Sequence, residues 1–230
     1  MKICGLLLAL LALTAGALVA GCHKKNGSAA APPAEAPSVE GTVVAVGDSL
    51  TAGYGLPETE AYPAKLENKL RQTGYRWRVV NAGISGETSS GTLSRVDWIL
   101  KLKPDIVVLE TGANDGLRGV DPQLTRDNID KTVTLLQGKG VVVVLAGMRM
   151  FANLGPSYTK EFADIYPSVA EKHGLILIPF FLAGVAGDAA LNQADGIHPV
   201  AKGYQVVTDL VYPFLLQAID RRKKVEAVPP

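Results

Sequence analysis

The chain has 230 residues, of which 47% are hydrophobic and 20% are charged, and its formal net charge is +1. This length suits one domain with a tail rather than two full domains, and so high an apolar content excludes a disordered protein. Lys2 is the only charged side chain of residues 1–21, so the rest of the chain has equal numbers of basic and acidic side chains and lacks the basic excess typical of a nucleic-acid-binding protein.

The amino terminus is expected to be a secretion signal. Residues 3–20 form an apolar run behind Lys2, and because about 18 apolar residues are the lower limit for crossing a bilayer, an uncleaved membrane helix is the alternative. The end of the run favours the signal. Leu-Val-Ala-Gly before Cys22 resembles a bacterial lipobox, in which small residues precede a cysteine that is lipidated. This resemblance implies cleavage of residues 1–21 and a lipid anchor on Cys22, in the bacterial cell envelope and facing the periplasm.

Polar or proline-rich segments flank the expected domain, which spans residues 41–220. Residues 22–40 are rich in Ala and Pro and have almost no large apolar side chain, so they are expected to form an extended tether. Residues 221–230 begin with four basic side chains and end in Pro-Pro. They are expected to be a frayed tail, and contact with anionic lipid headgroups is the alternative.

Five apolar runs of strand length occur in the domain. They are mostly β-branched, which is typical of strands buried on both faces of a sheet. The runs are residues 42–46, 77–80, 106–109, 141–146 and 175–178. Amphipathic segments alternate with them, as at residues 162–169 and 207–218, where apolar side chains recur at helical spacing. This alternation predicts an α/β fold with a parallel sheet covered by helices on both faces.

Helix ends can also be predicted locally. The pair Asp121-Pro122 indicates a helix start, with Asp as the N-cap and Pro at the first helical position. Pro167 and Pro213 interrupt helical patterns, so a kink or a break is expected at each.

Four polar clusters lie at or beyond the ends of the predicted strands, at residues 47–50, 81–88, 112–115 and 195–199. In an open parallel sheet, ligands bind beyond the carboxyl ends of the strands. Any one cluster is readily explained as turn chemistry. Together they bring Ser, His, Asp and an amide to one edge of the sheet, which indicates a catalytic site.

The three histidines have different settings. His23 sits beside two lysines in the tether, and His173 precedes Gly174 as expected for the last turn of a helix, so neither is assigned to a site. His198 follows Asp195 by three residues in a loop. A turn can bring that carboxylate to one ring nitrogen and leave the other nitrogen to accept a proton. The alternative is a satisfied loop pair without a catalytic role.

Ser49 directly follows the first strand and is the expected nucleophile, since a serine hydroxyl needs only a nearby base to become reactive. The backbone N–H groups of Ser49 and Gly86 and the side-chain amide of Asn114 are the expected donors to an oxyanion. Asp48 is interpreted as an N-cap or orienting residue. Asp188 is a rival partner for the histidine, but its surroundings predict the start of a short helix.

These four clusters resemble the four blocks of the SGNH, or GDSL, hydrolases. The longer strings G-D-S-L-T-A-G-Y-G (47–55), I-S-G-E-T (84–88) and G-A-N-D-G-L-R-G (112–119) are similar to the bacterial thioesterase I/lysophospholipase/arylesterase subgroup. The resemblance covers about residues 41–219. It implies a flavodoxin-like three-layer sandwich with strand order 2-1-3-4-5, the triad Ser49, His198 and Asp195, and an oxyanion hole from Ser49, Gly86 and Asn114. The lipobox, the tether and the loop 148–158 depart from the pattern.

Several other site types find no support in the sequence. Both cysteines, Cys4 and Cys22, lie in the first 22 residues, so the domain has no disulfide framework, thiolate metal site or thiol nucleophile. No G-x-S-x-G elbow surrounds Ser49, and no G-x-G-x-x-G, P-loop or H-E-x-x-H motif occurs. We therefore expect neither a cofactor nor a metal.

The leading hypothesis is a lipid-anchored serine hydrolase that cleaves carboxylic esters or thioesters through an acyl-enzyme, acting on aryl esters, short acyl esters or lysophospholipids. The loop after the fourth strand is expected to bind the acyl chain, although a lid or core role is the alternative. The candidate residues are Met148, Arg149, Met150, Phe151, Asn153 and Leu154. The alternative functions are a carbohydrate O-deacetylase and a non-catalytic envelope binding lipoprotein. A monomer, held to the membrane through its lipid, is expected.

Overall fold

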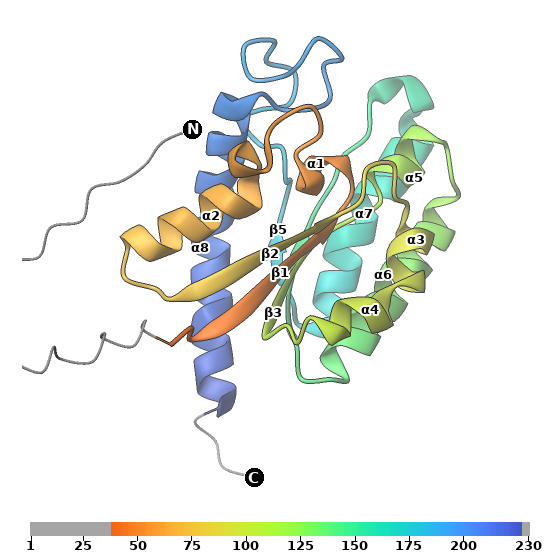
Figure 1. Ribbon diagram of the computed structural model, residues 1–230. Coiled ribbons are helices and arrows are strands. Elements are labelled where there is room, and N and C mark those ends of the chain that lie inside the picture. Colours follow the sequence, from red (N-terminus) through yellow and green to blue (C-terminus); the bar gives the residue numbers. More distant parts are fainter. Residues whose placement is uncertain (1–37, 227–230) are drawn as a thin grey trace, which may run out of the picture. The chain divides into compact units, whose positions relative to one another are not determined.

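The computed structural model describes residues 38–226 (Figure 1). The expected signal, the expected lipidation of Cys22 and most of the tether fall outside these residues. Five parallel strands form one sheet in the order β2-β1-β3-β4-β5, as predicted. The strands are β1 (Gly41–Gly47), β2 (Trp77–Gly83), β3 (Ile106–Glu110), β4 (Val142–Ala146) and β5 (Ile176–Ile178).

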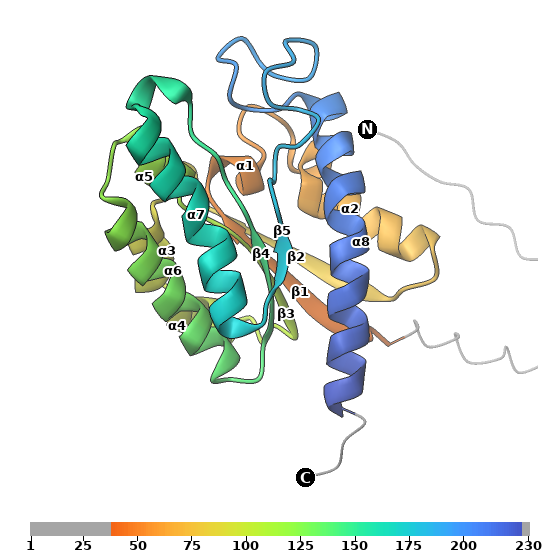
Figure 2. The same ribbon diagram turned by 180° about the vertical axis from the view of Figure 1, so that it is seen from behind.

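Helices cover both faces of this sheet (Figures 1 and 2). One face carries α2 (Tyr62–Gln72) and α8 (Ala201–Glu226). The other carries α3 (Ser89–Ser94), α4 (Val96–Lys101), α6 (Pro122–Gln137) and α7 (Pro156–His173). Short helical turns occupy the loops, namely α1 (Ser49–Ala52), η1 (Glu58–Glu60), α5 (Ala113–Leu117) and η2 (Ala152–Leu154). This is the three-layer sandwich that the sequence predicts.

The central strands are buried on both faces, as predicted. Val43–Val46 in β1 and Ile106–Leu109 in β3 are 0% exposed. The edge strand β2 is different, because Arg78 is exposed and Val79 and Val80 are only half-buried. An edge strand has one neighbour instead of two, so part of its surface stays in contact with solvent.

No break occurs at Pro167 or Pro213, where the sequence predicted a kink or a break. Each proline lies inside a continuous helix, Pro167 in α7 and Pro213 in α8. A proline removes one backbone donor from its helix. Buried apolar side chains on both sides of each proline, such as Tyr166 in α7 and Val211 and Leu215 in α8, keep the two helices packed against the rest of the domain.

The last helix also continues beyond residue 220, where the sequence predicted a frayed tail. Residues 221–226 are helical, and the side chains of Arg221 and Arg222 contact acceptors elsewhere in the domain. Arg221 Nη1 donates to the carbonyl of Gly174 at 2.8 Å, and Arg222 Nη2 lies 3.0 Å from Asp105 Oδ1. These contacts extend α8, so the prediction is wrong for residues 221–226. Residues 227–230 fall outside the described part of the chain.

The carboxyl ends of the parallel strands meet at one edge of the sheet, and the polar clusters follow them there. β1 runs from Gly41 to Gly47, so Ser49 follows its carboxyl end (Figure 1). None of the helices within residues 38–226 combines the length and the apolar character needed to cross a membrane.

Candidate active site

A tight turn after β1 presents the serine. Asp48 is the N-cap of α1, and its Oδ1 accepts a hydrogen bond from the Leu50 N–H at 2.9 Å. Ser49 is the first residue of this four-residue helix, as the sequence suggested. Gly47, before it, has no space for a side chain, because a Cβ there would collide with Thr51 and Glu110. Close packing under the turn therefore fixes the position of Ser49.

Ser49, His198 and Asp195 form one chain of contacts, as predicted. Ser49 Oγ lies 2.8 Å from His198 Nε2, and His198 Nδ1 lies 2.7 Å from Asp195 Oδ2. A carboxylate can only accept, so it places the imidazole proton on Nδ1 and leaves Nε2 free to accept from the serine. The ring of Tyr54 packs against the imidazole, with 4.7 Å between centroids.

The loop that carries the histidine is ordered by its own hydrogen bonds. Asp195 Oδ1 accepts from the backbone N–H groups of His198 and Ile197, at 3.0 and 2.9 Å. The backbone hydrogen bond from His198, the imidazole contact and the hydrogen bond from Ile197 lower the pKa of Asp195 to about 2. Gln193 N–H donates to the His198 carbonyl at 2.7 Å, which closes the base of the loop. The Asp195 carboxylate is therefore ionised in the folded protein at neutral pH.

Asp188, the rival partner, is not in contact with His198. It also does not begin a helix, because residues 188–190 form a turn in which Asp188 Oδ1 accepts from the Ala190 N–H at 2.8 Å. The same local bond that caps a helix closes this turn. His173 ends α7 ahead of Gly174, as predicted, and its Nε2 lies 2.7 Å from Asp130 Oδ1.

The three predicted oxyanion donors lie in the segments that follow the carboxyl ends of β1, β2 and β3. Asn114 belongs to α5, which follows Gly112 with a φ of 101°, and its Nδ2 donates to Asp48 Oδ2 at 3.0 Å. This bond takes one amide hydrogen of Asn114 and leaves the other available. The N–H groups of Ser49 and Gly86 donate to no protein acceptor within the described residues. These free donors are what an oxyanion needs.

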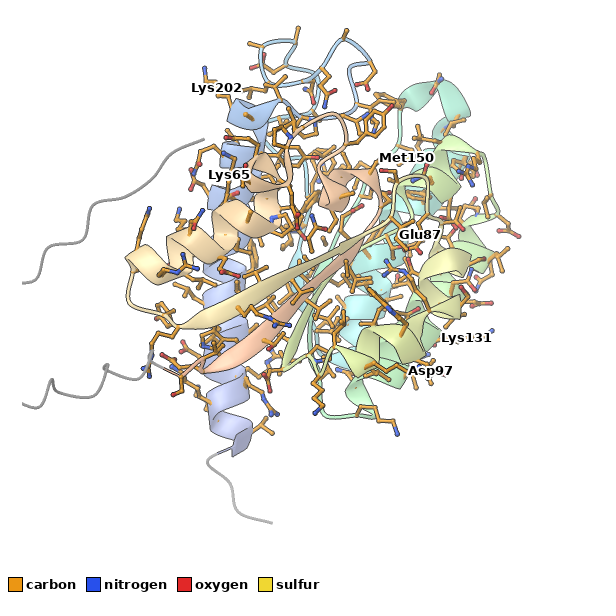
Figure 3. All side chains as sticks on the ribbon, in the orientation of Figure 1. Lys65, Glu87, Asp97, Lys131, Met150 and Lys202 are labelled. Atoms are coloured by element: carbon orange, nitrogen blue, oxygen red, sulfur yellow. The ribbon has the colours of Figure 1, made fainter. Side chains whose placement is uncertain are left out.

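The loop that carries Gly86 is held by two arginines that the sequence analysis did not single out. Arg118, which follows α5, donates from Nη2 to the Gly86 carbonyl at 2.9 Å. Arg95 contacts both carboxylate oxygens of Glu87, at 2.7 and 2.6 Å, and also donates to the Ala82 carbonyl at 2.8 Å. The Glu87 side chain, labelled in Figure 3, is 7% exposed and that of Arg95 is 12% exposed. The bidentate pair thus fixes the residue next to Gly86.

An apolar cavity of about 240 Å³ adjoins the triad. Four of the six predicted substrate-binding residues line it, namely Met148, Arg149, Met150 and Phe151, and Met150 lies against Gly116 of α5 (Figure 3). Asn153 and Leu154 do not line it, since the chain turns into η2 at this point. The other lining residues are Leu50, Ala113, Leu117, Phe180, Leu182, Ala186, Gly187, Gly196 and Ile197.

Three of these lining residues are sequence neighbours of the chemistry. Leu50 follows Ser49, Ala113 precedes Asn114, and Ile197 precedes His198. The sequence analysis missed the contribution of the loop after β5. The sequence feature that could have identified this loop is the apolar run from Phe180 to Leu182, which directly follows a predicted strand. Within residues 38–226, no cluster of three or more His, Cys, Asp or Glu side chains could hold a metal ion.

Comparison with known proteins identifies one matching family and several similar proteins. Residues 45–206 match the GDSL-like lipase/acylhydrolase family. The esterase TesA of Pseudomonas aeruginosa is 41% identical over 175 residues, which cover 76% of this chain and 87% of that protein. The thioesterase 1/protease 1/lysophospholipase L1 of Escherichia coli K12 is 37% identical over 169 residues, which cover 73% and 80%. A crystal structure of TesA matches with a TM-score of 0.74 and 40% identity over 77% of this chain and 99% of that chain.

The family match spans most of the domain and includes Ser49, Gly86, Asn114, Asp195 and His198. The sheet order and the helical layers agree with the solved relative. The chain therefore belongs to the GDSL-like lipase/acylhydrolase family, the SGNH hydrolases, and is an enzyme that hydrolyses ester bonds.

Proposed function

We propose that Ser49 is the nucleophile of a two-step hydrolysis in which His198 is the general base and Asp195 orients the imidazole. The observation that carries this assignment is the unbroken series of contacts from Asp195 through His198 to Ser49, at 2.7 and 2.8 Å. Nε2 takes the hydroxyl proton as Ser49 Oγ bonds to the ester carbonyl carbon. The same nitrogen then returns the proton to the leaving alcohol or thiol, and the acyl group remains on the serine.

Water completes the reaction in the second step. His198 removes a proton from the water, the hydroxide oxygen bonds to the acyl carbon, and the acyl–serine bond breaks as the serine recovers its proton. Negative charge develops on the carbonyl oxygen in both steps. We propose that the N–H groups of Ser49 and Gly86 and the second amide hydrogen of Asn114 bind that charge, which is supported by the lack of a protein acceptor for the two N–H groups within the described residues.

The triad assignment is tested by substitution. Ser49→Ala and His198→Ala should each lower kcat by several orders of magnitude while the fold is retained, and loss of Asp195 should lower kcat less than loss of either partner. Near-normal turnover by a purified, folded His198→Ala enzyme would contradict the assignment.

We propose that the acyl part of the substrate occupies the apolar cavity and that the leaving group, whether alcohol, phenol or thiol, faces solvent. A volume of about 240 Å³ is slightly below the usual range of ligand pockets, which measure about 300–1,000 Å³. It suits a short acyl chain or an aromatic ring. Because the leaving group lies outside the cavity in this proposal, the cavity does not distinguish simple esters, thioesters and lysophospholipids by their leaving groups. The names of the two relatives, an esterase and a thioesterase 1/protease 1/lysophospholipase L1, support this range of ester and thioester substrates.

A chain-length series distinguishes the substrate classes. We expect kcat/KM on p-nitrophenyl esters to rise from acetate to a medium acyl length and then to fall as the chain outgrows the cavity. Acetylated sugars provide the contrast, because the lining side chains are apolar rather than polar. Faster release of acetate from acetylated sugars than from any p-nitrophenyl ester would favour a carbohydrate O-deacetylase instead.

We also propose that residues 1–21 are a secretion signal and that Cys22 is lipidated, which would hold the enzyme at a membrane of the cell envelope. The support is the lipobox-like sequence before Cys22. Residues 23–40, if extended at about 3.1 Å per residue, would reach at most about 55 Å. A domain of this size is about 30 Å across, so the tether would allow the catalytic edge to turn toward the membrane surface.

A further inference from the structure

A second carboxyl group lies beneath the serine turn and takes no part in the triad. Glu110 ends β3, its residue is 0% exposed, and it lies against Asp48, which is 1% exposed. Glu110 Oε2 accepts hydrogen bonds from the Asp48 N–H at 3.2 Å and from the Thr51 hydroxyl at 3.0 Å. Each carboxyl group also perturbs the pKa of the other, so the two groups interact directly.

Neither of these two carboxyl groups is neutralised by an ion pair with a basic side chain in the described part of the chain. No ion pair within residues 38–226 includes Asp48 or Glu110. The ionisable neighbours around them are the buried phenols of Tyr62, Tyr166 and Tyr204 and, on the solvent side of Asp48, His198. Two buried carboxylates in contact cannot both keep their charge, so they share one proton.

The hydrogen bonds decide which of the two carries the proton. Both oxygens of Asp48 have a donor, because Oδ1 accepts from Leu50 N–H and Oδ2 accepts from the Asn114 amide. Such donors stabilise the ionised form. Glu110 Oε1 is buried and receives no hydrogen bond from an N–H or O–H donor within the described residues. An oxygen without a donor is where a carboxylic acid keeps its proton.

The electrostatics agree with this assignment. Burial, followed by the charge of Asp48, raises the pKa of Glu110 well above its ordinary value. Burial also raises the pKa of Asp48, but the hydrogen bonds that Asp48 accepts from the Leu50 N–H and the Asn114 amide oppose that effect. The anion therefore belongs on Asp48 and the proton on Glu110.

We propose that Glu110 is a positioning residue that remains a neutral acid, donates its proton to Asp48 and so holds Asp48 where it orients the Asn114 amide. The proposal rests on the assignment of Asn114 to the oxyanion. Asp48 is then the one negative charge beneath the serine turn, and it fixes both the start of α1 and the amide. A second anion here would push Asp48 away from Glu110 and would oppose the charge that develops on the oxyanion.

Infrared spectroscopy tests the protonation without using activity. The folded wild type at neutral pH should show the carbonyl stretching band of a neutral, buried carboxylic acid, and Glu110→Gln should lose that band. Glu87→Gln is the matched control, because Glu87 is nearly buried but paired with Arg95, so its substitution should remove no neutral-acid band. An unchanged spectrum for Glu110→Gln would overturn the proposal, whatever the role of Ser49.

Kinetics test the positioning role. Glu110→Ala should lower kcat about ten- to hundred-fold with little change in KM, since the interaction acts on the transition state. Glu110→Gln, which keeps the shape and a donor toward Asp48, should recover most of that loss. If the folded Gln variant is as impaired as the Ala variant, or if Ala has no effect on kcat, Glu110 does not act as a neutral donor to Asp48. Circular dichroism confirms that each variant is folded.

Discussion

At the residue scale, Asn114 has two amide hydrogens, and Asp48 takes one of them at 3.0 Å. If the other meets the oxyanion only as charge develops, Asn114→Ala should lower kcat about a hundred- to thousand-fold and leave KM nearly unchanged. Steady-state kinetics on a soluble p-nitrophenyl ester measure both quantities.

Asn153 provides a matched control for that experiment. It belongs to the same predicted site, but it does not line the cavity, so Asn153→Ala should keep both kcat and KM. An Asn114→Ala enzyme with altered KM and unchanged kcat would show that this amide binds the ground state of the substrate instead.

Asp195 links the site to the pH dependence of stability. Its pKa is about 2 in the folded protein, below the ordinary value of 3.8, chiefly because His198 N–H donates to it. A depressed carboxyl pKa stabilises the fold above the unfolded pKa, and this contribution is lost as the pH falls through the folded pKa. Asp195→Asn should therefore lower the free energy of unfolding at pH 7, and the difference from wild type should shrink between about pH 4 and pH 2. Urea unfolding across this range measures it, and a difference independent of pH would contradict the account.

At the element scale, the sequence predicts the strands and their alternation with helices well, because buried strands are short apolar runs with few competing patterns. Its errors lie where packing outweighs a local signal. Local rules predict a kink or a break at Pro167 and Pro213, and the break does not occur because buried neighbouring side chains keep α7 and α8 continuous. Arg221 and Arg222 look like part of a tail, but acceptors on other elements hold them in α8.

The connection between β2 and α3 depends on an ion pair between Glu87 and Arg95 that is nearly buried. Removal of one partner from such a pair leaves an uncompensated charge, which costs about 3–5 kcal/mol. Arg95→Met should therefore lower the free energy of unfolding by about 3 kcal/mol, since the pair retains some contact with solvent. It should also lower kcat, because Gly86 precedes Glu87.

An exposed pair gives the control for that element. Arg71 and Glu67 form an i,i+4 pair on α2 in which the Arg71 side chain is 66% exposed. Arg71→Met should change the free energy of unfolding by no more than about 0.5 kcal/mol. Equal effects of the two substitutions in urea unfolding would contradict the role given to the Glu87–Arg95 pair.

At the scale of the whole molecule, the triad could be predicted because its residues lie in short local motifs at strand ends. The cavity could be predicted only in part. Part of its lining comes from the loop after β5. No local sequence pattern predicts that Phe180 and Leu182 line the same cavity as Met148. The contact between Glu110 and Asp48 could not be predicted from the sequence, because it depends on the register between β1 and β3.

The proposed lipid anchor has a consequence for catalysis at membranes. A Cys22→Ser protein, exported by a substituted cleavable signal, should keep its rate on short soluble esters, since Cys22 is far from the domain in sequence. It should lose much of its rate on lysophospholipid embedded in vesicles, because anchoring raises the local concentration of enzyme at the lipid surface. Equal rates of the anchored and soluble forms on vesicles would show that a lipid on Cys22 serves only for retention.

The central claim is that Ser49 forms the covalent intermediate, and active-site labelling tests it most directly. A fluorophosphonate probe reacts with an activated serine, and mass spectrometry of the intact protein and its peptides locates the adduct. We predict one adduct on Ser49 of the wild type, none on Ser49→Ala, and strongly slowed labelling of His198→Ala. An adduct on another serine, or equal labelling of the Ser49→Ala protein, would contradict the account.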